Sequence, residues 1–212
     1  LYLLFDAVRS GRLEMSSRIK FSRKASRQTP SKLGVRAGRS ISVRTAIQAL
    51  AIKSANDVAV AVAERLGRTE KRFAKKMNAK AGALGMSRTN LVNASGLHDP
   101  KQVSTARDMA RLARGLRYKH RRYYKYFKAR SFRYAKRTYR GHNRFLKNYK
   151  GADGIKTGYV RASGFNLAGS AVRKRRRLIG VIVGGKSGAR RDLNLVGVMD
   201  AGFRLADGIG KP

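Results

Sequence analysis

The chain has 212 residues, 42% of them hydrophobic, which is enough to bury the core of one large domain or two small ones. Its 50 Lys and Arg residues against 11 Asp and Glu give a formal net charge of +39, which predicts attraction to nucleic acid, anionic lipid headgroups or acidic cell-wall polymers. Because the chain has no Cys, thiol catalysis, disulfides and zinc–thiolate sites are excluded, and no apolar run reaches the roughly 18–20 residues of a membrane span.

The first residues predict a helix over 1–10 that ends at Gly11. Leu1 to Val8 read as the later part of an apolar helix, and the chain does not begin with Met, so we expect the true N-terminus to have been removed. Residues 12–42 carry short apolar alternations between Ser, Arg and Gly, a pattern that predicts short strands and turns.

A helical region follows. Ser42 is a good N-cap for an apolar helix over 43–53, which Ser54-Ala55-Asn56 interrupts before a second apolar run stops at Gly67. Two further helices are predicted, one from Thr69 to about Leu84 and one from a capping box at 105–108 to about Leu116.

Residues 117–150 are strongly basic. They contain fourteen Lys and Arg, no acid, and seven of the nine tyrosines, and the alternation of Phe132, Tyr134 and Tyr139 predicts a hairpin. Arg and Lys for phosphates and Tyr rings for stacking on bases are also typical of a nucleic-acid surface, so a basic binding module without catalysis is the alternative function.

The C-terminal third predicts two adjacent antiparallel strands, over 165–172 and 178–183, buried against helices. A closing helix would carry an apolar stripe made of Leu193, Val196, Met199, Phe203 and Leu205. Helices in the middle, strands near the end and one closing helix favour an α+β fold.

Two triplets about a hundred residues apart indicate chemistry. Lys156-Thr157-Gly158 is predicted to end an edge strand, where it would offer a cation, a hydroxyl and room for a substrate backbone, a set suited to a free carboxylate. Ser54-Ala55-Asn56 lies at the break between two helices, where a hydroxyl can relay a proton and a carboxamide can orient a peptide bond. The plainer alternatives are that Ser54 caps the following helix and that Lys156 is a surface lysine in a turn.

Together these triplets resemble two of the three motifs of the penicillin-recognising serine acyl-transferases. With the stretches 93–97, 104–108, 184–187 and 191–192, the chain is similar over nearly its whole length to the D-alanyl-D-alanine carboxypeptidases, the low-molecular-mass penicillin-binding proteins. The resemblance implies an antiparallel sheet packed with helices, in the penicillin-binding protein/β-lactamase-like transpeptidase fold, as a single catalytic domain over 1–212 that is N-terminally truncated.

The family's roles can be carried over motif by motif. Ser54 would pass a proton to the leaving amine, Asn56 would hold the substrate amide, and Lys156 would tune the electrostatics. The carboxylate contacts would be Thr157 and Arg191, with Arg190 as a possible confusion. Gly158 would leave room for the substrate, and the backbone N–H of Tyr159 would form half of the oxyanion hole.

The third motif, Ser-x-x-Lys with the nucleophile and the general base, is not at its expected place. In the family it opens the helix whose later part resembles Leu1 to Val8, so we expect both groups to lie outside this chain and the chain alone to be inactive. The literal match Ser17-Arg18-Ile19-Lys20 falls in a strand-and-turn region. A class A β-lactamase is a third hypothesis, but no acid before Asp153 stands in a context that matches its deacylating Glu.

The resemblance also implies the surroundings of the enzyme. The expected partners are a peptidoglycan stem peptide ending in D-Ala-D-Ala and β-lactams as inhibitors. An anionic envelope polymer or membrane surface would suit the charge, with nucleic acid bound only non-specifically. No metal or organic cofactor is implied. The location would be the periplasm or cell envelope, with membrane association of the full-length protein left open.

Overall fold

A computed structural model describes residues 1–208 as helices and small antiparallel sheets, which confirms the predicted α+β class. The chain divides into two compact units. The first unit comprises Leu1–Val103 and Ala129–Gly141, and the second comprises Ser104–Lys128 and the residues from His142 onward. None of the described helices is long and apolar enough to cross a membrane.

The first unit holds six helical segments and two strand pairs among its described residues. In chain order they are α1 (Tyr2–Arg9), β1 (Arg18–Lys20), α2 (Arg23–Ser26), β2 (Ser40–Ser42), α3 (Val43–Gln48), a π-helix η1 (Ala49–Lys53), α4 (Asn56–Gly67), α5 (Glu70–Ala83), β3 (Ser131–Tyr134) and β4 (Arg137–Arg140).

Side-chain caps begin two of these helices where the sequence predicts them. The Ser42 hydroxyl accepts the N–H of Thr45, and the Thr69 hydroxyl accepts the N–H of Arg72. Helix α4 is the centre of this unit, because every residue from Asn56 to Ala63 is buried. A helix that is apolar on nearly all sides must be covered by neighbours, here α2, α5 and β1.

Strands β3 and β4 form the hairpin predicted from the basic region. Phe132 lies opposite Tyr139 and the two rings stack with centroids 5.3 Å apart. The two turn residues, Ala135 and Lys136, both have positive φ, which matches the right-handed twist of the strands but strains residues that carry a Cβ.

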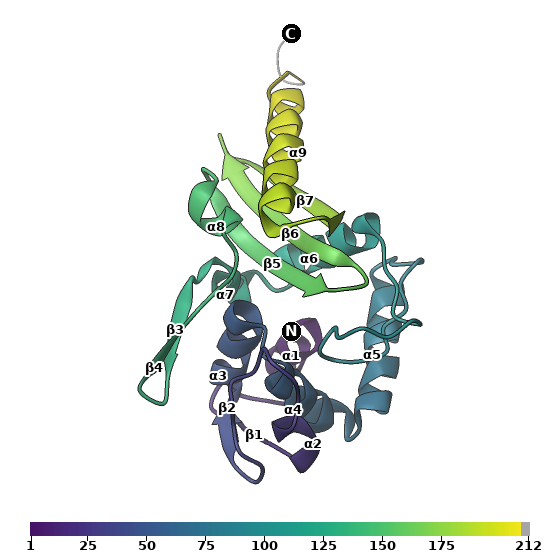
Figure 1. Ribbon diagram of the computed structural model, residues 1–212, viewed down its shortest axis with the longest axis vertical. Coiled ribbons are helices and arrows are strands. Elements are labelled where there is room, and N and C mark those ends of the chain that lie inside the picture. Colours follow the sequence, from purple (N-terminus) through teal and green to yellow (C-terminus); the bar gives the residue numbers. More distant parts are fainter. Residues whose placement is uncertain (209–212) are drawn as a thin grey trace. The chain divides into compact units, whose positions relative to one another are not determined.

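The second unit is built on the sheet β5–β6–β7. Its elements are α6 (Ala106–Lys119), a 3₁₀ turn η2 (Arg121–Tyr123), α7 (Lys125–Lys128), α8 (Phe145–Asn148), β5 (Ala152–Val160), β6 (Gly164–Arg173), β7 (Arg176–Gly185) and α9 (Gly188–Gly208). In Figure 1, α9 lies across one face of this sheet with α6 behind it, and both helices contact β6 and β7. The sequence did not predict the short helices α7 and α8.

The predicted apolar stripe on the closing helix is partly wrong. The buried face of α9 is formed by Leu195, Met199 and Phe203, four residues apart, which pack with Phe145 and Leu167 into one core cluster. Leu193 is 64% exposed and Leu205 is 70% exposed. At 3.6 residues per turn neither residue falls in the 195–199–203 row, and a hydrophobic residue on a helix is not by itself evidence of burial.

Candidate functional site

The triplet Ser54-Ala55-Asn56 lies at a break between two helices, as predicted. Helix α3 widens into the π-helix η1, and Ser54 then adopts a left-handed conformation with φ 61° and ψ 46° before α4 begins at Asn56. A non-glycine residue costs energy in this region, and such strain is frequent at functional sites. The N-cap of α4 is Ala55, without any side-chain hydrogen bond, so the alternative that Ser54 caps this helix is wrong.

Asn56 is held by backbone carbonyls of a preceding loop. Its N–H donates to the carbonyl of Ser31 at 2.7 Å, and its Nδ2 donates to the carbonyl of Thr29 at 3.0 Å. The Ser31 hydroxyl in turn donates to the carbonyl of Lys53 at 2.9 Å. The carboxamide, only 7% exposed, is thus fixed by its amino group, and within residues 1–208 its oxygen is left without a hydrogen bond. That oxygen can accept an amide N–H from a substrate.

Asp57, the next residue, is a structural support that the sequence analysis did not single out. Its fully buried carboxylate accepts the backbone N–H groups of Leu33 and Gly34, each at 2.9 Å, and that of Val58 at 2.9 Å. The charge is therefore matched by several donors, as a buried carboxylate requires. Asp57 ties the helix start that carries Asn56 to the loop that contains Leu33. The only signal in the sequence was an acid inside a strongly apolar run.

The second triplet, Lys156-Thr157-Gly158, lies on β5, the edge strand of its sheet, as predicted. It does not end the strand: β5 continues to Val160 and pairs with β6 as far as Gly164. The prediction placed the end too early because Gly158 reads as a strand breaker. The alternative that Lys156 is a surface lysine in a turn is wrong, since Lys156 is half-buried in mid-strand.

The environment of Lys156 lowers the pKa of its side chain. Burial lowers the pKa of Lys156 to about 8, and the positive charge of Arg191 lowers it in the same direction. The ammonium donates to the carbonyl of Thr157 at 2.7 Å. A lysine with this pKa exists in both protonation states near neutral to mildly basic pH, which suits a group that tunes the electrostatics of a reaction.

Gly158 and Tyr159 complete the open part of the strand. A Cβ added at Gly158 would meet only the Cβ of Asn166, at 3.9 Å, so no packing inside this unit requires a glycine there. The space is consistent with close approach of a substrate backbone. Tyr159 is 59% exposed and its ring packs against Phe165 with centroids 4.3 Å apart.

Arg191 stands at the start of α9 and is buried, whereas Arg190 is exposed. Asp192 holds the Arg191 guanidinium by accepting from Nε at 3.0 Å and from Nη2 at 2.7 Å. The remaining nitrogen, Nη1, donates to the carbonyl of Asn166 at 3.4 Å, and Asn166 pairs with Gly158 in the sheet. The structure thus brings Arg191 to the strand pair that carries the second triplet, while Ser54 and Asn56 belong to the first unit.

The literal Ser-x-x-Lys match does not form the constellation that a nucleophile and base require. Arg18 to Lys20 form strand β1, and Ser17 precedes it, with a hydroxyl that accepts the N–H of Glu14 at 2.9 Å. Ser17 lies in the turn before the strand and Lys20 ends the strand, so the two side chains do not share the face of a helix as a nucleophile and base of this motif do. Within residues 1–208 the structure also has no group of three or more His, Asp or Glu side chains placed to hold a metal ion.

Comparisons with known proteins bear on this arrangement. The family model described as D-alanyl-D-alanine carboxypeptidase matches residues 1–187. The carboxypeptidase DacF of Bacillus subtilis is 31% identical over 217 residues, which cover 96% of this chain and 53% of DacF. The chain therefore spans about half the length of this relative.

Solved structures that are similar to this chain are penicillin-binding proteins. Penicillin-binding protein 5 from Haemophilus influenzae is similar with a TM-score of 0.91 at 27% identity, over 96% of this chain and 60% of that one. Penicillin-binding protein D2 from Listeria monocytogenes, in its cefotaxime-bound form, gives 0.85 at 29% identity, over 95% and 83%. These likenesses confirm the predicted penicillin-binding protein fold. With the family match over most of its length, the chain belongs to the D-alanyl-D-alanine carboxypeptidase family.

Proposed function

We propose that this protein is a serine-type D-Ala-D-Ala carboxypeptidase that trims peptidoglycan stem peptides through an acyl-enzyme and is trapped by penicillin. The observation that carries the proposal is the edge strand β5, where a lysine of lowered pKa, a threonine hydroxyl and an open glycine follow one another beside Arg191. Membership of the family supports the reaction, and a relative crystallised with cefotaxime supports β-lactams as inhibitors.

The residue roles follow from these groups. A stem peptide would lie along the free edge of β5, as a peptide adds to a sheet, with its terminal carboxylate at Thr157 and Arg191. The backbone N–H of Tyr159 would stabilise the oxyanion that forms when a serine attacks the carbonyl between the two D-alanines. Arg191 suits the carboxylate better than Arg190, because it is buried and held by Asp192.

The first triplet would act on the same substrate. The free carboxamide oxygen of Asn56 would accept an amide N–H of the stem peptide, and the Ser54 hydroxyl would pass a proton to the amine of the leaving D-alanine. Water would then hydrolyse the acyl-enzyme. Lys156, with a pKa of about 8, would set the electrostatics of these proton transfers. Membership of the family supports assigning these five side chains and the N–H of Tyr159 to one reaction, carried out by a single catalytic domain over 1–212.

We further propose that residues 1–212 contain neither the nucleophile nor the general base. The sequence holds one Ser-x-x-Lys, and its serine precedes a strand rather than opening a helix. Purified chain 1–212 should therefore show no mass increase after incubation with benzylpenicillin. A stoichiometric adduct, located by peptide mapping at Ser17 or Ser54, would contradict this part of the proposal.

The activity itself is tested on the full-length protein. It should release D-alanine from a peptide ending in D-Ala-D-Ala and form a covalent adduct with benzylpenicillin, and Lys156→Ala should reduce both rates. Release of D-alanine without any adduct, or no release at all, would refute the proposed carboxypeptidase. A location in the cell envelope fits a peptidoglycan substrate, and fractionation of cells would check it.

The packing of the β3–β4 hairpin argues against the alternative function, a nucleic-acid-binding module. Tyr139 packs on Phe132, and its hydroxyl donates to the carbonyl of Leu33 at 3.4 Å, so this ring is not free to stack on a base. Binding of nucleic acid would then be electrostatic and non-specific, and should fall steeply with added salt.

A further inference from the structure

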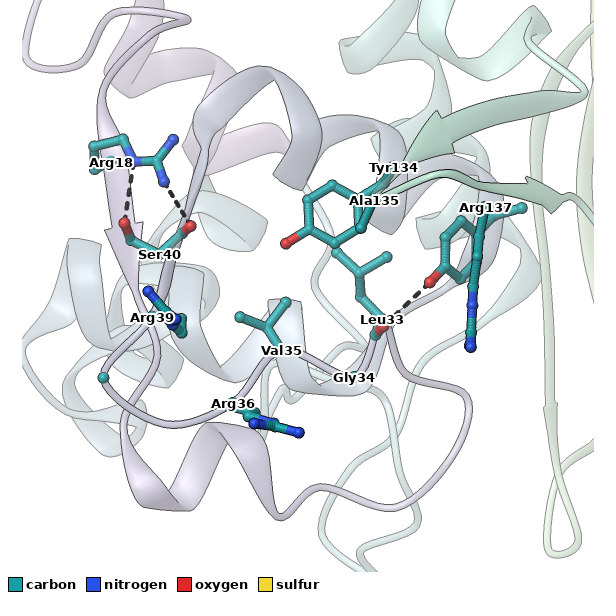
Figure 2. A pocket seen from close by; sticks show the side chains of 12 residues that line it. Arg18, Leu33, Gly34, Val35, Arg36, Arg39, Ser40, Tyr134, Ala135 and Arg137 are labelled. Carbon is teal, nitrogen blue, oxygen red and sulfur yellow. Dashed lines mark hydrogen bonds between the residues drawn. The ribbon is translucent and has the colours of Figure 1, made fainter.

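A basic surface pocket lies inside the first unit, separate from the Ser54 triplet. It has a volume of about 560 Å³ and is formed by the start of β1, the loop over 33–39 with the first residue of β2, and the β3–β4 hairpin. Four arginines from these three segments line it: Arg18, Arg36, Arg39 and Arg137. Figure 2 shows all four around the pocket.

The charge of this pocket is not compensated. No carboxylate among the described residues lines the pocket. The acidic side chains of the first unit make their hydrogen bonds and ion pairs at other places. The guanidinium groups of Arg36, Arg39 and Arg137 have no hydrogen bond or ion pair within residues 1–208. Like charges gathered in a hollow repel one another and raise the local potential, and an anion would relieve that repulsion.

The guanidinium of Arg18 is held in one orientation by Ser40. Its Nε donates to the Ser40 hydroxyl at 3.0 Å and its Nη2 donates to the Ser40 carbonyl at 2.7 Å (Figure 2). These two bonds fix the plane of the guanidinium and leave Nη1 free to donate. An oriented guanidinium loses less conformational entropy when it binds an oxyanion.

We propose that this pocket binds a phosphate ester of a small sugar or polyol, either free or as a unit of an anionic polymer. Arginine is the side chain that best matches phosphate, since its planar fork can donate two parallel hydrogen bonds. Several arginines without a competing acid favour a doubly charged phosphate over a carboxylate.

The floor of the pocket suits the carbon part of such a ligand. Leu33 and Val35 are buried, and Figure 2 shows their side chains beside Tyr134, between the four arginines that line the pocket. The apolar carbon faces of a sugar can lie on these side chains and on the tyrosine ring. The volume falls in the range of about 300–1,000 Å³ that is typical of small-molecule sites.

The walls are held in place by the same carboxylate that supports Asn56. Asp57 accepts the N–H groups of Leu33 and Gly34, and the Tyr139 hydroxyl bonds to the carbonyl of Leu33. The pocket is therefore largely preformed, which reduces the ordering cost of binding.

The test is isothermal titration calorimetry of the full-length protein with glucose 6-phosphate at low salt. The double variant Arg36→Gln with Arg137→Gln removes two pocket charges. The matched control is Arg65→Gln with Arg133→Gln, which removes the same net charge at two exposed positions, one on the same hairpin, that do not line the pocket.

We expect saturable binding to the unmodified protein, a loss of at least about tenfold in affinity for the pocket variant, and a change of less than about threefold for the control. Inorganic phosphate should bind more weakly than the ester, and glucose should not bind. A circular dichroism spectrum and an unfolding midpoint equal to those of the unmodified protein establish that the pocket variant is folded.

Three results would overturn the proposal. The first is absence of saturable binding. The second is an equal loss of affinity for glucose 6-phosphate in both variants, because binding would then depend on the net charge of the protein and not on the pocket. The third is a pocket variant that loses binding to phosphatidylglycerol vesicles or to a DNA duplex while glucose 6-phosphate binding is unchanged, since the surface would then serve a membrane or a nucleic acid.

Discussion

The carboxylate of Asp57 accepts the backbone N–H of Leu33 at 2.9 Å, across 24 positions of the sequence. This buried bond joins the helix that begins with Asn56 to the loop that lines the arginine pocket. One acidic side chain thus supports both the proposed substrate amide contact and the proposed phosphate site. Removal of the Asp57 carboxylate should therefore weaken both proposed sites.

Asp57→Asn tests this support. The variant keeps one acceptor but turns an NH₂ group toward backbone N–H donors, so at least one buried donor loses its partner. We expect the free energy of unfolding to fall by about 1–3 kcal/mol, measured by urea denaturation. Asp99→Asn, at a solvent-facing loop bond, is the matched control and should change stability by less than about 0.5 kcal/mol. Equal effects in the two variants would show that the Asp57 carboxylate is not a special support.

Lys156 should make stability depend on pH. Its folded-state pKa of about 8 lies below the value of 10.5 expected for an unfolded chain, so the native state disfavours the charged form. The resulting cost is fully present below pH 8 and disappears as the pH rises from 8 to 10.5. Lys156→Met should therefore be more stable than the unmodified protein at pH 7, and the difference should shrink over that range.

Denaturant unfolding at several pH values measures this effect. Lys186→Met is the control, because it makes the same substitution at an exposed lysine. A Lys156→Met variant that is less stable at pH 7 would mean that the native fold stabilises the ammonium and that its pKa is not lowered.

Arg191 should matter for substrate binding more than its neighbour. In the full-length protein, Arg191→Gln would remove the proposed charge-assisted contact to the terminal carboxylate, and we expect KM to rise by about 10- to 100-fold. Arg190→Gln, which removes an exposed charge, should change KM by less than about threefold. Steady-state kinetics on a D-Ala-D-Ala peptide decides between the two arginines, and the reverse order would assign the contact to Arg190.

The turn between β6 and β7 stores strain that one substitution can release. Lys174 and Arg175 have φ of 45° and 64°, the left-handed region that costs a residue with a Cβ about 1–2 kcal/mol. Arg175→Gly should raise the free energy of unfolding by about 1 kcal/mol, whereas Arg175→Ala keeps the Cβ and should not. If both variants were equally stabilised, the cause would be the lost positive charge.

The buried face of α9 can be checked with a pair of leucines two positions apart. Leu195→Ala should cost about 2–5 kcal/mol, because it opens a cavity beside Met199 and Phe145. Leu193→Ala removes the same atoms from an exposed position and should cost less than about 0.5 kcal/mol. Thermal or urea unfolding of the two variants would show whether the row 195–199–203 is the buried one.

Local signals in the sequence predicted the parts of this fold that depend on neighbouring residues. The caps at Ser42 and Thr69, the helix break at Ser54 and the hairpin around Phe132 and Tyr139 follow from short-range hydrogen bonding and period-two patterning, which a sequence displays directly. The two triplets were recognisable for the same reason, because each is contiguous.

Only the tertiary structure decided which groups meet across long separations. The apolar pattern of the sequence predicted Leu193, and not Leu195, on the buried stripe, whereas packing against β6 and β7 buries Leu195 and leaves Leu193 exposed. The sequence showed Arg36 and Arg137 as two of 50 basic residues, and the fold brought them to one hollow without a counter-charge. Burial and electrostatic potential depend on distances in space, so the lowered pKa of Lys156, the bracing by Asp57 and the arginine pocket could be seen only after the chain had been folded.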